Sequence, residues 1–197
     1  MQYSASSSKP CQDTNRIRRT VCLLLNQQII ETIVLQLQAH KAAATARDHS
    51  SFGQLNSLFD GIVSDLTEST NAIVSRIHSL GGQECATIRL SAHQSHTRPP
   101  EIVDGREQLR SLLSGYMKYD FAARKIMKSI QELGDSETNA LLSLIGVSIE
   151  RNIWLLETYL QATAAGLDGR NLPQWTPAFE NVFRSLHRNQ RSCSHEI

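Results

Sequence analysis

The sequence predicts an all-α protein built from four long helices in one domain. Apolar residues recur at steps of three and four over four long segments, as on one face of a helix. No segment alternates polar and apolar residues for long enough to form a strand. The chain has 197 residues, 40% of them hydrophobic and 20% charged, which suits one folded domain and excludes a disordered chain.

The first two helices are separated by a short polar break. Residues 14–47 contain no Gly or Pro and predict one long helix, preceded by a flexible polar N-terminal tail, residues 1–13. Residues 48–51 supply good N-cap side chains for a second helix. We expect that helix to end at Gly81-Gly82, because Gly commonly terminates helices.

The third and fourth helices are joined by a tight turn. Asp104 is placed to cap the start of the third helix, which Gly134-Asp135 should end. Ser136 then caps the fourth helix, and Gly166 ends it. We therefore expect these two helices to lie antiparallel to each other.

The connection between the second and third helices is much longer. Residues 83–103 are irregular, with a short helix expected near 88–93, and a connection of this length predicts a long crossover across the bundle. The bundle domain is thus expected over residues 14–165. A C-terminal tail, residues 166–197, follows it, with a short helix expected near 179–188.

Composition excludes several classes of function. The net charge is +1, from 20 basic and 19 acidic residues, so the chain is not a strongly basic nucleic-acid domain. No apolar stretch is long enough to predict a membrane span or a secretory signal, so we expect a cytoplasmic protein with no membrane partner. No CxxC motif is present, and reduced thiols are expected at all four cysteines, Cys11, Cys22, Cys85 and Cys193.

Several short motifs occur in a characteristic order along about residues 20–162. They are Leu24-Leu25-Asn26, Ile30 and Arg47 on the first helix, Leu58-Phe59-Asp60 and Arg76-Ile77-His78-Ser79-Leu80-Gly81-Gly82 on the second, Ala86-Thr87 after it, Asp104-Gly105, Gly134-Asp135-x-x-Thr138, and Asn152-Ile153-Trp154-Leu155-Leu156-Glu157. In this order they resemble the Dps family (DNA-binding proteins from starved cells). The resemblance implies a ferritin-like four-helix bundle that assembles into a hollow dodecamer, oxidises Fe(II) with hydrogen peroxide or oxygen, and stores iron.

The resemblance also implies an iron site between two-fold related subunits. Family members supply a His from the first helix and a His-x3-Asp-x10-Asp-x3-Glu pattern from the second. With Asp60 setting the register, these ligand positions fall on Ala43, Asn56, Asp60, Asn71 and Ser75. Fe(II) needs several hard oxygen or imidazole ligands held together. Because only Asp60 keeps the usual ligand, the site is predicted to be degenerate and its Fe(II) oxidation weak or absent.

Two interpretations of Asp60 remain open. Iron is the metal expected if the site still binds one, with Asp60 joined by His40, His49 and Asn56 as the remaining ligands. His40 lies one turn before Ala43, the residue at the family's His position, and is expected on the same face of the first helix. Alternatively, Asp60 is a structural carboxylate near a helix N-terminus, where the helix dipole favours negative charge. Asp65 and Glu68, further along the same helix, are expected on a solvated or lumen-facing edge.

The pores of the family's cages offer a second comparison. Acidic residues line the three-fold iron pores in the family, whereas the matching positions here are Ala140 and Leu144. Asp135 and Glu137 lie nearby in sequence and remain candidates for an acidic vestibule. Without a ring of carboxylates, electrostatic attraction of Fe(II) into a cage should weaken.

The two tails carry the basic residues that a DNA interface would use. The candidates are Lys9, Arg16, Arg18 and Arg19 near the N-terminus, and Arg184, Arg188 and Arg191 near the C-terminus. Repeated on many subunits, such weak basic sites become a strong polyvalent surface. The alternative is that the N-terminal arginines belong to the first helix and pair with carboxylates. Two functions therefore stay open: an iron-handling cage, or a catalytically silent cage that binds DNA or other Dps-like subunits in a mixed assembly.

Overall fold

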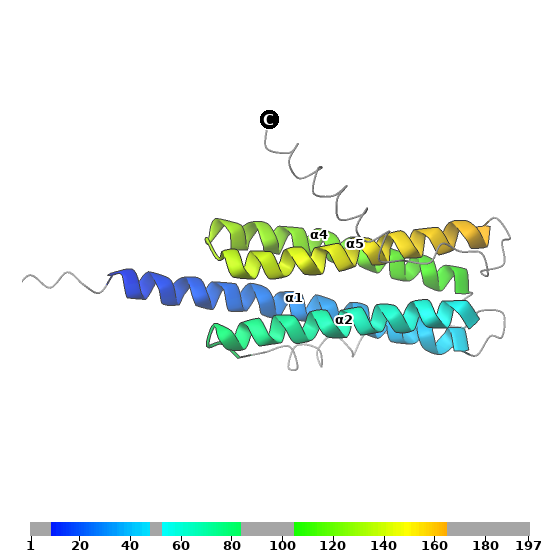
Figure 1. Cartoon of the computed structure of the whole chain (residues 1–197), viewed down its shortest axis with the longest axis horizontal. Helices are drawn as coiled ribbons and strands as arrows, with labels where there is room; N and C mark the ends of the chain where they lie inside the picture. Colours follow the sequence, from blue (N-terminus) through cyan, green and yellow to red (C-terminus); the bar gives the residue numbers. More distant parts are fainter. Residues whose placement is uncertain (1–8, 48–52, 84–104, 165–197) are drawn as a thin grey trace, which may run out of the picture.

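A computed structural model describes residues 9–47, 53–83 and 105–164, which form four helices (Figure 1). These helices are α1 (Lys9–Arg47), α2 (Gly53–Ser79), α4 (Gly105–Glu132) and α5 (Ser136–Ala164). Within these ranges the chain contains no β-strand. The prediction of an all-α fold with four long helices is confirmed.

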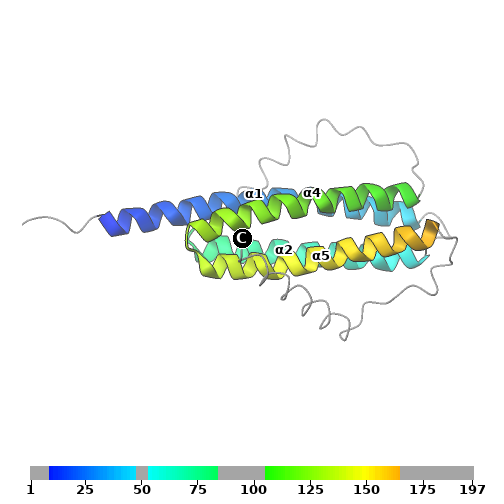
Figure 2. The same ribbon diagram turned by 90° about the horizontal axis from the view of Figure 1, so that it is seen from above.

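The helices form a bundle in which α1 and α2 run antiparallel, as do α4 and α5 (Figures 1 and 2). Helix α1 packs against both α2 and α4, and α4 packs against α5. Helices α2 and α4 run in the same direction, so the chain has to travel the length of the bundle between Gln83 and Gly105. This is the wiring of a four-helix bundle with one long crossover, as the length of that connection predicted.

Helix α1 begins at Lys9, earlier than the expected start near Thr14. The N-terminal tail predicted over residues 1–13 is therefore helical from residue 9. Pro10 lies in the first turn, where its missing N–H would have no intrahelical partner in any case. Residues 14–19 are exposed because this end of α1 projects beyond the bundle (Figure 1).

Several predictions fall outside the described residues. They concern residues 1–8, His49, the short helices near 88–93 and 179–188, the cap at Asp104, and the C-terminal tail from Gly166 onward.

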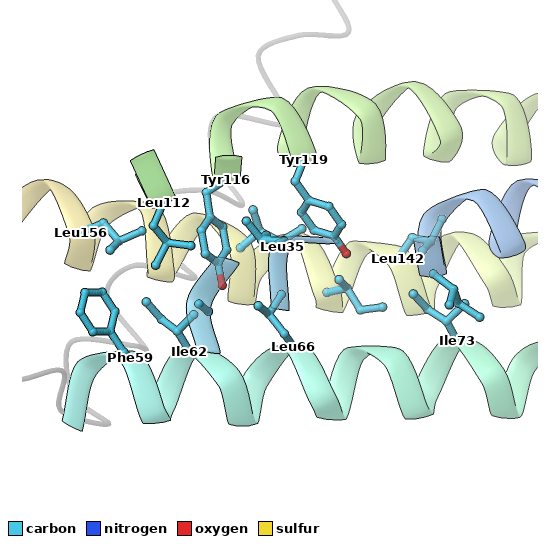
Figure 3. Packing of buried hydrophobic residues seen from close by; sticks show 14 of the residues in the cluster. Leu35, Phe59, Ile62, Leu66, Ile73, Leu112, Tyr116, Tyr119, Leu142 and Leu156 are labelled. Carbon is cyan, nitrogen blue, oxygen red and sulfur yellow. The ribbon is translucent and has the colours of Figure 1, made fainter. Parts of the chain in front are cut away.

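The core is a continuous cluster of apolar side chains supplied by all four helices (Figure 3). Its largest fully buried members include Phe59 and Ile62 from α2, Leu112 and Tyr116 from α4, and Leu156 from α5. Each lies at the three- or four-residue spacing that keeps one helix face toward the bundle axis. Burial of this stripe, rather than helix propensity alone, is what stabilises helices of this length.

Two helix ends have the predicted glycines, but one cap differs. Gly81 and Gly134 adopt φ angles of 74° and 77°, the left-handed conformation that ends many helices. Ser136 was expected to cap α5, yet Asp135 does so, because its Oδ1 accepts a hydrogen bond from the Thr138 amide at 3.0 Å. The chain reverses so tightly after Gly134 that Asp135 is already the N-cap position.

By length and composition alone, residues 14–44 of α1 would be able to cross a membrane. In the bundle this segment packs against α2 and α4 and contributes buried residues to the core. It also buries polar side chains, including Gln28 and Thr32, of which Thr32 shares a 2.8 Å hydrogen bond with Tyr119 of α4. These contacts describe α1 as a core helix of the bundle.

Candidate functional site

Arg76 joins the end of α2 to the start of α5. Its Nη2 lies 2.9 Å from Asp135 Oδ1, and its Nε donates to Thr138 Oγ1 at 2.8 Å. The side chains of Arg76 and Asp135 are only 12% and 13% exposed. Thr138 in turn donates its hydroxyl to Asp135 at 2.6 Å. Three residues of the Dps-like motifs thus form one largely buried polar cluster that locks the two helix ends together.

Asp135 and Glu137, the two candidates for an acidic vestibule, both pair with Arg76 of this cluster. Glu137 also pairs with Arg76, at 2.5 Å, although its own side chain is 79% exposed. Burial by itself would raise the pKa of Asp135, but hydrogen bonds from Thr138 and the charge of Arg76 lower it overall. Both carboxylates are therefore engaged by a cation within the subunit, which leaves less negative charge to attract Fe(II).

The lowered pKa of Asp135 predicts a pH-dependent contribution to stability. An acid whose pKa falls on folding stabilises the fold above its unfolded pKa, about 4, and this contribution is lost as pH falls toward the folded pKa. We expect Asp135→Asn, which keeps a good N-cap, to lower the free energy of unfolding by about 1 kcal/mol or more at pH 7. The difference between variant and parent should shrink toward about pH 3.

Urea unfolding at both pH values, at one protein concentration, measures this effect. The exposed Glu132 supplies a matched control, and Glu132→Gln should shift the midpoint little at either pH. A constant difference between Asp135→Asn and the parent across the pH range would contradict the assignment.

A second polar network crosses the interior between α2, α4 and α5. Asn152 donates to Asp65 at 3.0 Å and to the hydroxyl of Tyr116 at 3.2 Å. Arg151 forms an ion pair with Asp65, whose side chain is 24% exposed. Glu68 is exposed, in line with a solvated edge, whereas Asp65 is partly buried because α5 brings an arginine and an amide to it. Burial raises the pKa of Tyr116, so its phenol stays protonated.

A hydrogen bond joins the middle of α1 to the chain just after α2. Asn26 donates to the carbonyls of Cys22 and Gln83, at 2.9 and 3.2 Å. A Cβ on Gly82 would lie 2.6 Å from the Cys22 sulfur, so the close approach requires glycine here. Burial raises the pKa of the Cys22 thiol, which lowers its thiolate fraction. This thiol is free, as expected.

The predicted iron-ligand positions on α2 share one outward face. Asp60, Asn71 and Ser75 are exposed, and Asn56 is half-buried. Their spacings of four, eleven and four residues keep them aligned along the helix. The buried Asn56 Oδ1 has no hydrogen-bond partner among the described residues. These four positions thus carry one carboxylate and three neutral side chains.

The predicted positions on α1 do not behave as one face. Ala43 is 2% exposed and belongs to the core, whereas His40 is exposed. A separation of three residues leaves side chains about 60° apart around a helix, and here the core boundary falls between them. The expectation that His40 shares the face of Ala43 is therefore wrong. A histidine at position 43 would point into its own bundle.

No group of three or more His, Cys, Asp or Glu side chains converges anywhere in the described parts of the chain. The two predicted pore positions, Ala140 and Leu144, are exposed, and Leu144 is 62% exposed. Neither supplies a ligand or a charge. A metal site that needs several ligands would thus have to draw on residues outside the described ranges or on a second subunit.

The candidate DNA-binding residues near the N-terminus lie on the projecting part of α1. Arg16, Arg18 and Arg19 are exposed there, and none pairs with a carboxylate among the described side chains. They are therefore helical, as the alternative supposed. The side chain of Lys9 and the C-terminal candidates Arg184, Arg188 and Arg191 lie outside the described side chains.

Four helices, a long crossover, and buried hydrogen bonds and ion pairs between helix ends define a ferritin-like bundle. The chain belongs to the ferritin-like domain family, whose model matches residues 22–165. It is 23% identical over 150 residues to a DNA protection during starvation protein from Brevibacillus brevis, covering 74% of this chain and 97% of that relative. This relative and the solved structures described next are Dps proteins, to which the chain is similar.

Two solved structures show the same fold. DpsC from Streptomyces coelicolor has 24% identity and a TM-score of 0.66, over 81% of this chain and 91% of that one. Dps from Microbacterium arborescens in the high iron form has 16% identity and a TM-score of 0.65, over 74% and 95%. At these identities the likeness concerns the fold, and the resemblance inferred from the motifs is confirmed at that level.

Proposed function

We propose that this chain assembles with copies of itself into a hollow dodecameric cage in the cytoplasm, for iron storage and protection against oxidative stress. The proposal includes little or no Fe(II) oxidation by the cage itself. Membership of the ferritin-like family and the Dps-type fold support the iron-related role. Exposed apolar side chains on α1 and α5, including Leu23, Leu37 and Leu144, support contacts between subunits.

One observation supports the proposal of weak oxidation: of the four ligand positions on α2, only Asp60 is a carboxylate. The other three positions are the neutral Asn56, Asn71 and Ser75, whereas the family pattern has three carboxylates and a histidine at these four positions. Neutral amides and hydroxyls compensate little of the charge of a dehydrated Fe(II) ion. Asp60, with His40 and Asn56, is the remaining ligand set that we propose for residual binding.

Stopped-flow absorbance after mixing the protein with Fe(II) and hydrogen peroxide tests this proposal. We expect no fast phase with a stoichiometry tied to the number of subunit pairs, because the site lacks the ligands that hold iron for oxidation. Light scattering on the same preparation should report a dodecamer. A fast, stoichiometric phase would contradict weak oxidation, and a monomer at micromolar concentration would contradict the cage.

DNA binding is the second candidate function, and the projecting end of α1 favours it. Arg16, Arg18 and Arg19 are exposed within one helical turn, beyond the packed part of the bundle. Cations that neutralise phosphates release counterions, and many copies on one cage would add avidity. A silent cage that acts through DNA or through mixed assembly with other Dps-like subunits is the alternative to an iron-handling role.

We expect the triple variant Arg16→Ser, Arg18→Ser, Arg19→Ser to bind duplex DNA at least about tenfold more weakly at low salt. Its affinity should also fall less steeply with salt than that of the parent, because fewer phosphates are neutralised. Gel shifts or anisotropy titrations at several salt concentrations measure both quantities. The exposed pair Lys125 and Lys128 on α4 supplies a control of similar charge. An equal loss on replacing that pair would assign DNA binding to general surface charge instead.

A further inference from the structure

A groove between α4 and α5 exposes an unusual amount of aromatic and apolar surface. Phe121 is 75% exposed and Met117 is 55% exposed, both on α4. Ile153 and Trp154 of α5 are half-buried and line the same groove. A large aromatic side chain left in water forfeits about 1.5–3 kcal/mol of burial free energy, so such a patch commonly marks a binding surface.

The rim of this groove is mainly acidic. Asp120, Glu150 and Glu157 line it, together with a single cation, Arg124. Arg124 lies 2.8 Å from Asp120 on its own helix and 2.7 Å from Glu150, and the second contact crosses from α4 to α5. Three carboxylates against one guanidinium leave the groove with a net charge of −2. An occupant should therefore combine apolar side chains with positive charge.

The end of this chain has that composition. Residues 179–191 carry Phe179, Val182, Phe183 and Leu186, at spacings of three, four and seven residues, the pattern of an amphipathic helix face. The same stretch has three arginines and one glutamate, a net charge of +2 that complements the groove. Phe179 to Leu186 would extend about 11 Å as a helix, the same as Met117 to Arg124 on α4.

The chain is long enough to return to the groove. Helix α5 ends at Ala164, about 15 Å along its axis from Trp154. The 14 residues from 165 to 178 reach up to about 46 Å when extended. A segment tethered so near its target binds at a high effective concentration, which offsets a modest contact area.

We infer that residues 179–191 of the same chain dock into the groove between α4 and α5. Their apolar side chains cover Phe121 and Met117, and their arginines face the acidic rim. The segment thus acts as a built-in cover for this face of the bundle, separate from the α2 face considered for iron.

Hydrogen exchange by mass spectrometry on the full-length protein tests the inference. We expect amides of residues 179–188 to exchange at least about tenfold more slowly than an unstructured peptide of the same sequence. Phe121→Ser should abolish this protection, and so should Phe183→Ser within the segment. Leu144→Ser removes a comparably exposed apolar side chain of α5 outside the groove and should leave the protection intact. Unchanged exchange of the buried α1 amides will show that each variant remains folded.

Two results would overturn the inference. The first is exchange of residues 179–188 at the unprotected rate in the parent protein. The second is protection that survives Phe121→Ser. If that variant also loses assembly mass by native mass spectrometry, the groove is a contact between subunits instead.

Discussion

Restoring three iron ligands on α2 is expected to raise the rate of Fe(II) oxidation by about tenfold or more, equivalent to at least about 1.4 kcal/mol in the barrier. The variant is Asn56→His, Asn71→Asp, Ser75→Glu in a chain that keeps Asp60. All four positions lie on one face of α2. Asn71 and Ser75 are exposed, so their new carboxylates do not disturb the core, and the half-buried Asn56 exchanges one polar side chain for another. Two added carboxylates and an imidazole supply the charge and donor atoms that Fe(II) requires.

Stopped-flow absorbance with hydrogen peroxide measures the gain in the rate of Fe(II) oxidation. The control variant places the histidine at an exposed position on another helix. Asn71→Asp and Ser75→Glu combined with Gln131→His add the same groups but place the imidazole on α4, away from this face. Adding His40→Ala to the restored variant asks whether this exposed histidine completes the site. A drop to the parent rate would support His40 as a ligand. A restored variant that is folded, assembled and no faster than the parent would contradict the assigned register.

Placing histidine at position 43 is expected to destabilise the fold by about 3 kcal/mol. Ala43 is 2% exposed within the core cluster, so a larger ring must displace well-packed neighbours. Its polar nitrogens would also be buried without partners, which adds a desolvation penalty. The resemblance alone would recommend this substitution as a repair of the iron site, whereas the packing opposes it.

The neighbouring position supplies the matched control. Ala44 is exposed, and Ala44→His should change the free energy of unfolding by no more than about 0.5 kcal/mol. Urea unfolding midpoints of both variants, with the slope checked for constancy, separate the two cases. Equal stability of Ala43→His and Ala44→His would show that position 43 faces outward in the assembled protein.

The residues that carry the family resemblance turn out to be those that hold the bundle together. Arg76, Asp135 and Thr138 tie α2 to α5, and Asn152 joins α5 to α2 and α4. In the sequence these residues stand out as motifs, but their contacts are not visible there. Their residue types do indicate that each has a polar partner, because buried arginine and asparagine side chains must form hydrogen bonds.

The sequence by itself determined the fold class, the four helices and the glycine-ended turns. These features depend on local periodicity, on residue type or on motif order, all of which are readable along one chain. Only the tertiary structure decided that Asp135 caps α5, that Asp65 pairs with Arg151, and that Ala43 is buried while His40 is exposed. Each of these depends on which side chains a distant helix brings within a few ångströms, and on a small rotation of a helix relative to its neighbours. Spacing along one helix specifies neither.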